Sequence, residues 1–249
     1  MKVALSIFEA HLPAPVGGCH WSENVCLFCS FADLYLNRVA IIRLQTRYKG
    51  AQMDILLVSG FLGSGKTTMI LSTIDEIIKR KHKKVVVIVN DFGQIGIDGK
   101  VMEKYGLEVR EMPSGCICCT LGSDLLATLQ DVAIAFHPDL VVIEPTGVAD
   151  PEAIHDTLKL YRGPIGTTRI VIIVDAVRYP VIMKALARPL QNQLKAANVI
   201  IINKVDGVGD EDIKSIEQSF RDQGLSTKVI AASATTGMNL DQVVEAMVG

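Results

Sequence analysis

The residues whose types and spacing best suit chemistry form a glycine-rich stretch at 60–68, with the sequence GFLGSGKTT. It matches the motif G-x-x-x-x-G-K-[ST], whose backbone N–H groups cradle phosphate oxygens. An apolar run at 55–58 precedes it, and apolar residues at helical spacing within 69–78 follow it. A helix that begins there adds the positive end of its dipole to the loop. The stretch therefore predicts a phosphate-binding loop between a strand and a helix.

Each part of this loop has an expected role in binding a nucleotide. The Lys66 ammonium is expected to reach the β- and γ-phosphates, and the Thr67 hydroxyl to be a ligand of Mg²⁺. An ordinary glycine turn is the alternative, which the flanking strand and helix disfavour. The residues of the loop that we expect to contact the nucleotide are Gly60, Gly63, Ser64, Gly65, Lys66, Thr67 and Thr68.

Two acidic residues follow or end apolar runs that resemble buried strands. Asp91 is expected to bind Mg²⁺ directly or through water, or to orient the attacking water; a turn or a helix cap is its alternative role. Glu144 is expected to hold Mg²⁺ through water, and the backbone N–H of Gly147 to sense the γ-phosphate. Lys66, Asp91 and Glu144 are thus the catalytic candidates. The candidate Mg²⁺ ligands are Thr67, Asp91 and Glu144.

A second motif, N-K-x-D, comes after another apolar run, with Asn203, Lys204 and Asp206 at its fixed positions. A carboxylate at Asp206 can accept hydrogen bonds from both N1–H and the exocyclic amine of guanine, a pair of donors that adenine lacks. The Lys204 stem is expected to stack over the base. The stretch that contains Ser233 and Ala234 follows the next apolar run, where a backbone N–H can meet guanine O6. Together these residues predict a guanine site.

Three thiols lie within four residues, at Cys116, Cys118 and Cys119. A helix expected to begin near Ser123 would favour their thiolate forms through its positive end. Three thiolates suit a soft or borderline metal such as Zn²⁺, with Co²⁺ or Cu⁺ also compatible. The tight spacing leaves a fourth position for water, a remote side chain or a ligand from a partner. Redox sensing and buried, inert cysteines are the alternatives.

Composition excludes some classes of partner and compartment. The chain has 249 residues and a formal net charge of −2, so no basic excess indicates binding to nucleic acid or to an anionic membrane. Its apolar runs have the length of strands, which predicts no transmembrane helix. The N-terminus is a poor match to a signal peptide. We therefore expect a cytoplasmic protein.

The elements that must position these residues begin near Met53. Residues 1–52 show weak periodicity and are interpreted as an extension of uncertain structure, whereas 53–249 alternate apolar strands with amphipathic helices. A small metal site in the extension is the alternative, with Cys19, His20, Cys26 and Cys29 as its ligands.

Several of the expected strands are continuous β-branched runs, which is typical of strands buried on both faces of a parallel sheet. Asp150-Pro151-Glu152 has the residues of a helix N-terminus. The pattern predicts a three-layer α/β domain with a mainly parallel sheet of about seven strands. The expected strands lie at 54–59, 84–90, 107–112, 139–144, 168–175, 198–203 and 227–231.

Together the motifs resemble those of the CobW family of metal-handling P-loop GTPases. The resemblance rests on the phosphate loop, the block from Asn90 to Asp98, the Gly115-Cys116-Ile117-Cys118-Cys119 stretch, Glu144-Pro145-Thr146-Gly147 and the N-K-x-D motif. It covers about residues 53–249 and resembles the GTPase domain alone. One departure is Asp91, where family members usually carry Glu.

This resemblance implies a GTP-hydrolysing metallochaperone that uses Mg²⁺ and couples nucleotide state to capture and release of a transition metal. Zinc or cobalt is the expected metal, and the relatives UreG and HypB extend the choice to nickel. A client metalloprotein or cofactor-assembly enzyme is the implied partner, together with a nucleotide-dependent homodimer. The alternative is a regulatory GTP-binding switch whose thiols sense oxidation, whereas the guanine motif argues against a P-loop kinase.

Overall fold

The structure, a computed structural model, describes residues 52–89, 108–111 and 117–249, with the backbone alone described for Lys81, 108–111 and 117–123. Within these residues, seven strands form one sheet in the order β3-β2-β4-β1-β5-β6-β7, and each neighbouring pair is parallel. The predicted sheet of about seven strands is thus confirmed. The strands are β1 Met53–Ser59, β2 Val85–Val89, β3 Glu108–Glu111, β4 Leu140–Glu144, β5 Ile165–Asp175, β6 Val199–Asn203 and β7 Lys228–Ala231.

Helices lie between successive strands, as the alternating pattern predicts, except between β2 and β3, whose connection is outside the described residues. The N-terminus of α5 is the one expected, since Asp150 Oδ1 accepts a hydrogen bond of 3.0 Å from the Glu152 N–H. The predicted start of the helix near Ser123 was wrong, because α4 begins six residues earlier. The helices are α2 Lys66–Lys81, α4 Ile117–Phe136, α5 Pro151–Leu158, α6 Tyr179–Lys195, the short 3₁₀ helix η2 Val205–Gly207, α7 Asp210–Asp222 and α8 Leu240–Val248.

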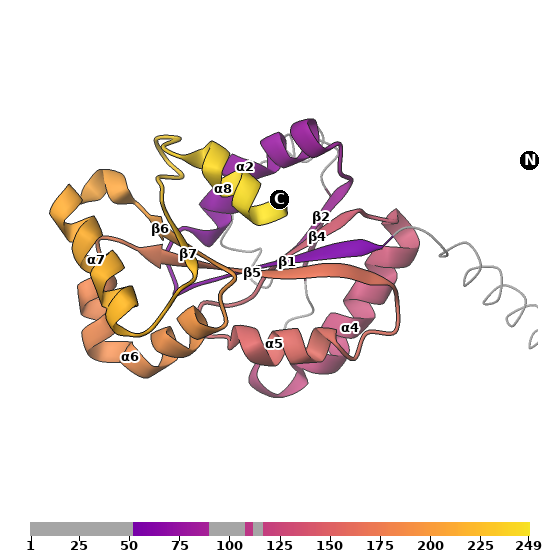
Figure 1. Cartoon of the computed structure of the whole chain (residues 1–249). Coiled ribbons are helices and arrows are strands. Elements are labelled where there is room, and N and C mark those ends of the chain that lie inside the picture. The colour runs from indigo at the N-terminus through magenta and orange to yellow at the C-terminus, as the bar shows by residue number, and fades with distance from the viewer. Residues whose placement is uncertain (1–51, 90–107, 112–116) are drawn as a thin grey trace, which may run out of the picture. The chain divides into compact units, whose positions relative to one another are not determined.

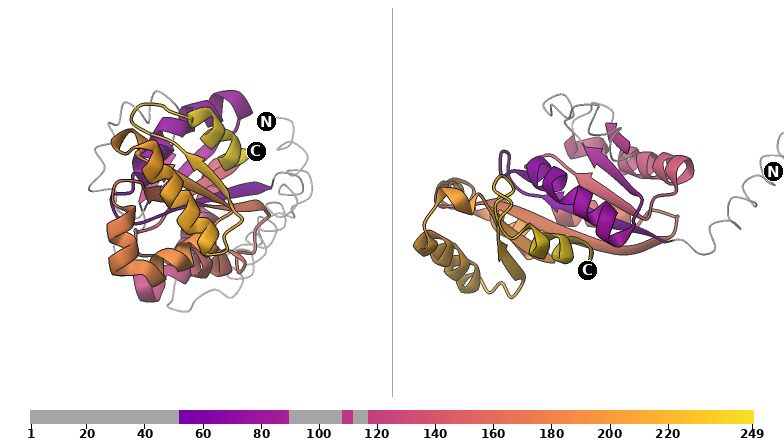
Figure 2. Two further views of the ribbon diagram at one scale, coloured as in Figure 1. Left: turned by 60° about the vertical axis from the view of Figure 1, so that its left-hand side comes forward. Right: turned by 90° about the horizontal axis from the view of Figure 1, so that it is seen from above.

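The sheet is the middle layer of three. Its central strands are buried on both faces, which explains their continuous apolar sequences. Apolar residues of α2 and α8 pack with alternate strand residues in one core cluster, and Figures 1 and 2 show these two helices side by side. The helices α4, α5 and α6 cover the opposite face (Figure 1). The predicted three-layer α/β fold is therefore confirmed.

Strand register brings the chemically promising residues to one edge of the sheet. Asp175, the last residue of β5, pairs with Asn203 at the end of β6, and Glu144 ends β4 opposite Val89. The loop after Ser59 leaves the central strand at the same edge. Ligands of parallel α/β sheets bind outside the carboxyl ends of the strands. None of the helices in the described part of the chain is long and apolar enough to cross a bilayer.

Candidate functional site

The glycine-rich loop links β1 to α2 as predicted. Gly63 has a φ of 72°, and a Cβ there would come within 2.8 Å of an Arg178 guanidinium nitrogen, so only glycine suits this point. The Lys66 side chain is buried, with its ammonium 3.4 Å from the Phe61 carbonyl at the start of the loop. Ser64 Oγ is also buried and has no hydrogen-bond partner among the described residues. The loop thus offers buried polar groups that suit a phosphate.

The Thr67 hydroxyl and the Glu144 carboxylate, 77 positions apart in sequence, lie against each other. The hydroxyl donates a hydrogen bond to Glu144, at 2.8 Å from Oε1 and 3.0 Å from Oε2. Mg²⁺ prefers oxygen ligands, and this hydroxyl and carboxylate supply such oxygens beside the phosphate loop. These two residues therefore fit a Mg²⁺ ion, and their role as its ligands stays a prediction.

Gly147 packs closely against the backbone of the phosphate loop. The residue is buried, and a Cβ there would collide with the backbone of Leu62. The Gln193 amide of α6 donates hydrogen bonds of 3.2 Å to the Gly147 carbonyl and 3.1 Å to the Ala149 carbonyl. The sequence analysis missed Gln193, and no motif marks it. A buried helix side chain thus holds the loop in which a phosphate-sensing N–H was predicted.

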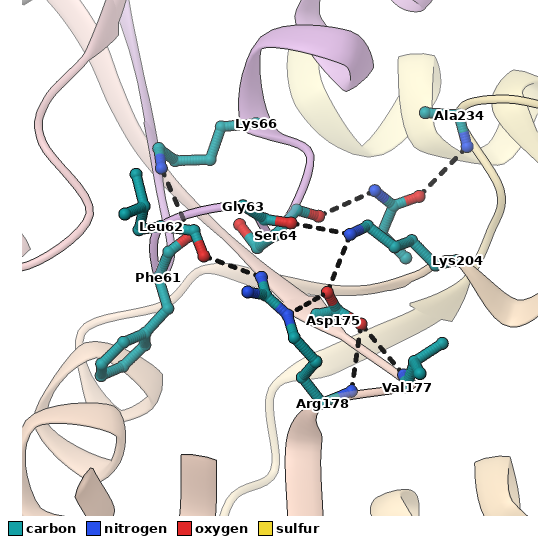
Figure 3. A network of polar contacts seen from close by, with 11 residues as sticks. Phe61, Leu62, Gly63, Ser64, Lys66, Asp175, Val177, Arg178, Lys204 and Ala234 are labelled. Carbon is teal, nitrogen blue, oxygen red and sulfur yellow. Dashed lines mark hydrogen bonds and ion pairs between the residues drawn. The ribbon is translucent and has the colours of Figure 1, made fainter. Parts of the chain in front are cut away.

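Asn203 joins the phosphate loop to the segment after β7. Its amide donates to the Ser64 carbonyl at 2.9 Å, and its oxygen accepts from the Ala234 N–H at 3.1 Å (Figure 3). Ser233 is buried beside this contact, and Asp206 lies exposed in η2. The residues predicted to bind guanine therefore lie at the same edge of the sheet as the phosphate loop.

Lys204 and Arg178 both connect Asp175 to the phosphate loop (Figure 3). The Lys204 ammonium lies 2.8 Å from Asp175 Oδ2 and 2.7 Å from the Gly63 carbonyl. Arg178 Nε lies 2.7 Å from the same carboxylate oxygen, while its Nη2 donates to the Leu62 carbonyl at 2.7 Å. Stacking of the Lys204 stem on a base stays a prediction.

Asp175 is the acid that the sequence analysis missed, and its side chain is fully buried between these two cations. Burial alone would raise the pKa of this carboxyl. Hydrogen bonds from Lys204 and Arg178, with the charge of Lys204, outweigh burial and hold the pKa below its ordinary value. The signal was present in the sequence, since Asp175 ends a buried strand as Glu144 does.

The structure describes only some of the residues predicted to bind a metal or to orient the attacking water. Asp91, Cys116 and the cysteines of the amino-terminal extension lie outside the described residues. Cys118 and Cys119 fall in the first turn of α4, in the part of the helix described by its backbone. Within the residues whose side chains are described, no three His, Cys, Asp or Glu residues gather as a metal site would require.

A parallel α/β sheet with a phosphate loop at its carboxyl edge, a Thr–Glu pair beside the loop and an N-K-x-D segment across from it defines a P-loop nucleotide-binding protein. Residues 54–231 match the model of the family described as CobW/HypB/UreG, nucleotide-binding domain. The chain belongs to this family.

Two curated relatives and one solved structure show the extent of the similarity. Zinc chaperone YeiR of Escherichia coli is 34% identical over 176 residues, which cover 70% of this chain and 53% of YeiR. Zinc-regulated GTPase metalloprotein activator 1 of Dictyostelium discoideum is 30% identical over 206 residues, 67% of this chain and 42% of the relative. The hydrogenase maturation factor HypB of Archaeoglobus fulgidus shares the fold, with a TM-score of 0.54, 18% identity, and coverage of 79% of this chain and 89% of HypB. The chain thus spans about half the length of the curated relatives it matches.

Proposed function

We propose that this chain is a Mg²⁺-dependent GTPase domain that couples GTP hydrolysis to the handling of a transition metal. One observation supports the proposal most strongly. Lys66, Thr67 and Glu144 come together at the phosphate loop, and Asn203 of the N-K-x-D motif is hydrogen-bonded to the same loop. Bound Mg²⁺ would supply charge that neutralises the phosphates and orders their oxygens. Lys66 would hold the phosphate chain, and Thr67 with Glu144 would hold the ion, the latter through water.

Guanine is the base that the site would select. Asp206 is exposed beside the buried Asn203 and is open to the N1–H and amine of a base. The Asn203 bridge to Ser64 and Ala234 would keep the base segments and the phosphate loop in one geometry. The relative named as a zinc-regulated GTPase supports GTP as the nucleotide.

Zinc is the first candidate for the metal cargo, with cobalt and nickel next. The relatives named as zinc chaperones support this choice, and so does the stretch Cys116-Ile117-Cys118-Cys119. The positive end of α4 would stabilise the thiolates of Cys118 and Cys119, which lie in its first turn. A client metalloprotein would receive the ion, and GTP would favour a homodimer. We place the activity in the cytoplasm.

Metal and nucleotide titrations of the full chain test this proposal. Zn²⁺ affinity is measured in the presence of GDP and of a non-hydrolysable GTP analogue, with native mass spectrometry for stoichiometry and dimerisation. The proposal expects one Zn²⁺ per chain, an affinity that differs between the two nucleotide states by about fivefold or more, and loss of binding in the Cys116→Ser/Cys118→Ser/Cys119→Ser variant. Equal affinities would remove the coupling. Reversible thiol oxidation without stoichiometric metal would instead favour a redox switch.

A further inference from the structure

Three consecutive carbonyls of the phosphate loop accept hydrogen bonds from side chains at the ends of β5 and β6 (Figure 3). Two of the donors, Asn203 and Lys204, belong to the N-K-x-D motif, but the third, Arg178, belongs to no motif. It is the residue before α6. The three bonds are Arg178 to Leu62 at 2.7 Å, Lys204 to Gly63 at 2.7 Å and Asn203 to Ser64 at 2.9 Å.

A donor on a carbonyl also decides where the N–H of the same peptide unit points. The unit is planar and trans, so its C=O and N–H point in opposite directions. Arg178 holds the Leu62 carbonyl, and therefore fixes the N–H of Gly63. A charged donor on the carbonyl also polarises the unit and strengthens that N–H as a donor to an anion. In phosphate loops such N–H groups are the ones that contact the nucleotide.

Arg178 is itself held in place from the side opposite the loop. Its Nε is 2.7 Å from Asp175 Oδ2, and its backbone N–H donates to Asp175 Oδ1 at 3.1 Å, as does that of Val177 at 3.0 Å. The carboxylate is buried, whereas the Arg178 side chain is 45% exposed. The guanidinium therefore reaches the two acceptors with two different nitrogens of one planar group, whereas a lysine at position 178 would have to reach both with one nitrogen at the end of a flexible stem.

We infer that Arg178, anchored by Asp175, is a positioning residue that orients the Leu62–Gly63 peptide so that the Gly63 N–H can bind the phosphates of a nucleotide. The inference rests on the proposed function, because it requires that the loop bind guanine nucleotides. It assigns a role to a residue outside the recognised motifs. It also gives the buried Asp175 a purpose, since this carboxylate orients both cations that reach the loop.

The test compares Arg178→Ala and Arg178→Lys with wild type by titration with fluorescent GDP and by competition with GTP and ATP. Arg169→Ala is the matched control, because Arg169 also donates to a backbone carbonyl, that of Ala246 at 2.6 Å, but it lies on β5 and its acceptor lies in α8 rather than in the phosphate loop. We expect both Arg178 variants to bind GDP about tenfold more weakly, the loss typical of one charge-assisted hydrogen bond. The preference for GTP over ATP should remain, because Asp206 is untouched. The control should bind like wild type.

Other outcomes of these titrations would overturn the inference. Wild-type GDP affinity in Arg178→Lys would overturn the inference, because a positive charge alone would then suffice. Wild-type GDP affinity in Arg178→Ala would overturn it as well. If an Arg178 variant lost its preference for GTP over ATP together with its affinity for GTP, Arg178 would have a general structural role. That result would also overturn the inference. If thermal melting shows that Arg178→Ala does not fold, Arg178→Gln replaces it under the same criteria. Failure of the wild-type protein to bind guanine nucleotides would overturn the proposed function, and the inference with it.

Discussion

The Thr67 hydroxyl donates a hydrogen bond of 2.8 Å to the Glu144 carboxylate across two parallel strands. Thr67 lies in the first turn of the helix after the phosphate loop and Glu144 ends the neighbouring strand, so the fold alone brings them together. An ion that needs oxygen ligands would replace this hydrogen bond with two interactions of its own. The contact is thus the point at which Mg²⁺ dependence can be tested.

Thr67→Ala and Glu144→Gln should each lower the GTP turnover number by at least about a hundredfold, because each removes part of the phosphoryl-transfer machinery. Lys66→Ala should do the same by removing the phosphate-binding cation. The measurement is phosphate release as a function of Mg²⁺ concentration. Thr157→Ala is the control, since Thr157 is a half-buried threonine of α5 whose hydroxyl donates to the Ala153 carbonyl of its own helix. Unchanged turnover in Thr67→Ala and Lys66→Ala would contradict the assignment.

Base selection can be changed at Asp206. Asp206→Asn replaces an acceptor pair with one acceptor and one donor, so GTP affinity should fall about a hundredfold or more and xanthosine triphosphate should bind better than GTP. Competition titration with GTP, xanthosine triphosphate and ATP measures the change. Asp210→Asn, which alters an exposed acid in the first turn of α7, should leave all three affinities unchanged. Equal binding of ATP and GTP by the wild type would rule out a guanine site.

Much of this arrangement could be predicted from local sequence, because it depends on patterns within short windows. Continuous apolar runs gave the seven strands, although β5 begins at Ile165, three residues before the predicted start. The phosphate loop, Glu144 and Asn203 follow directly from motifs at strand ends. Thr67 and Glu144 could be expected at one edge of the sheet, and the structure shows that they are in contact.

The residues that were missed act through tertiary contacts that no short window contains. Arg178 has a role only because β5 lies beside β1, which brings it to the Leu62 carbonyl. Gln193 lies near the C-terminal end of α6 and matters because its side chain reaches the loop of Gly147. The early start of α4 was missed because the helix was expected to begin near Ser123, whereas Cys118 and Cys119 already lie in its first turn.

Stability should depend on pH through Asp175. Its folded-state pKa lies below the unfolded value of about 3.9, so its contribution is complete above that pH and is lost as pH falls towards the folded-state value. Asp175→Asn should cost on the order of 2 kcal/mol at pH 7 and should flatten the decline of stability between about pH 5 and pH 3. Urea unfolding at a series of pH values measures both effects.

Asp54 supplies the matched control for this experiment. Burial opposes ionisation there too, but hydrogen bonds from Lys83 and Thr167 lower its pKa overall. Asp54→Asn should therefore flatten the same acid decline while leaving nucleotide affinity unchanged, since Asp54 lies near the start of β1, away from the phosphate loop. Asp175→Asn should also weaken nucleotide binding. If the free energy of unfolding falls equally steeply with pH in wild type and in Asp175→Asn, ionisation of Asp175 does not stabilise the fold.

The last prediction concerns the hydrogen bonds from Gln193 to the carbonyls of Gly147 and Ala149. Gln193→Leu keeps the side chain buried but leaves both carbonyls without their donor, so we expect a loss of about 1–3 kcal/mol in the free energy of unfolding. A loosened loop should also hold the Gly147 N–H less well against a γ-phosphate. Affinity for a non-hydrolysable GTP analogue should then fall by up to about tenfold, the effect of one hydrogen bond, while GDP affinity stays near wild type.

Urea unfolding and paired titrations with the GTP analogue and GDP measure these two effects separately. Gln218→Leu is the control, because Gln218 is an exposed glutamine of α7 that, among the described residues, bonds within its own helix. It should change neither stability nor the ratio of the two affinities by a measurable amount. If Gln193→Leu weakens GDP and the GTP analogue equally, Gln193 supports the whole site rather than the loop of Gly147. The selective loss is expected because GDP lacks the phosphate that this loop would contact.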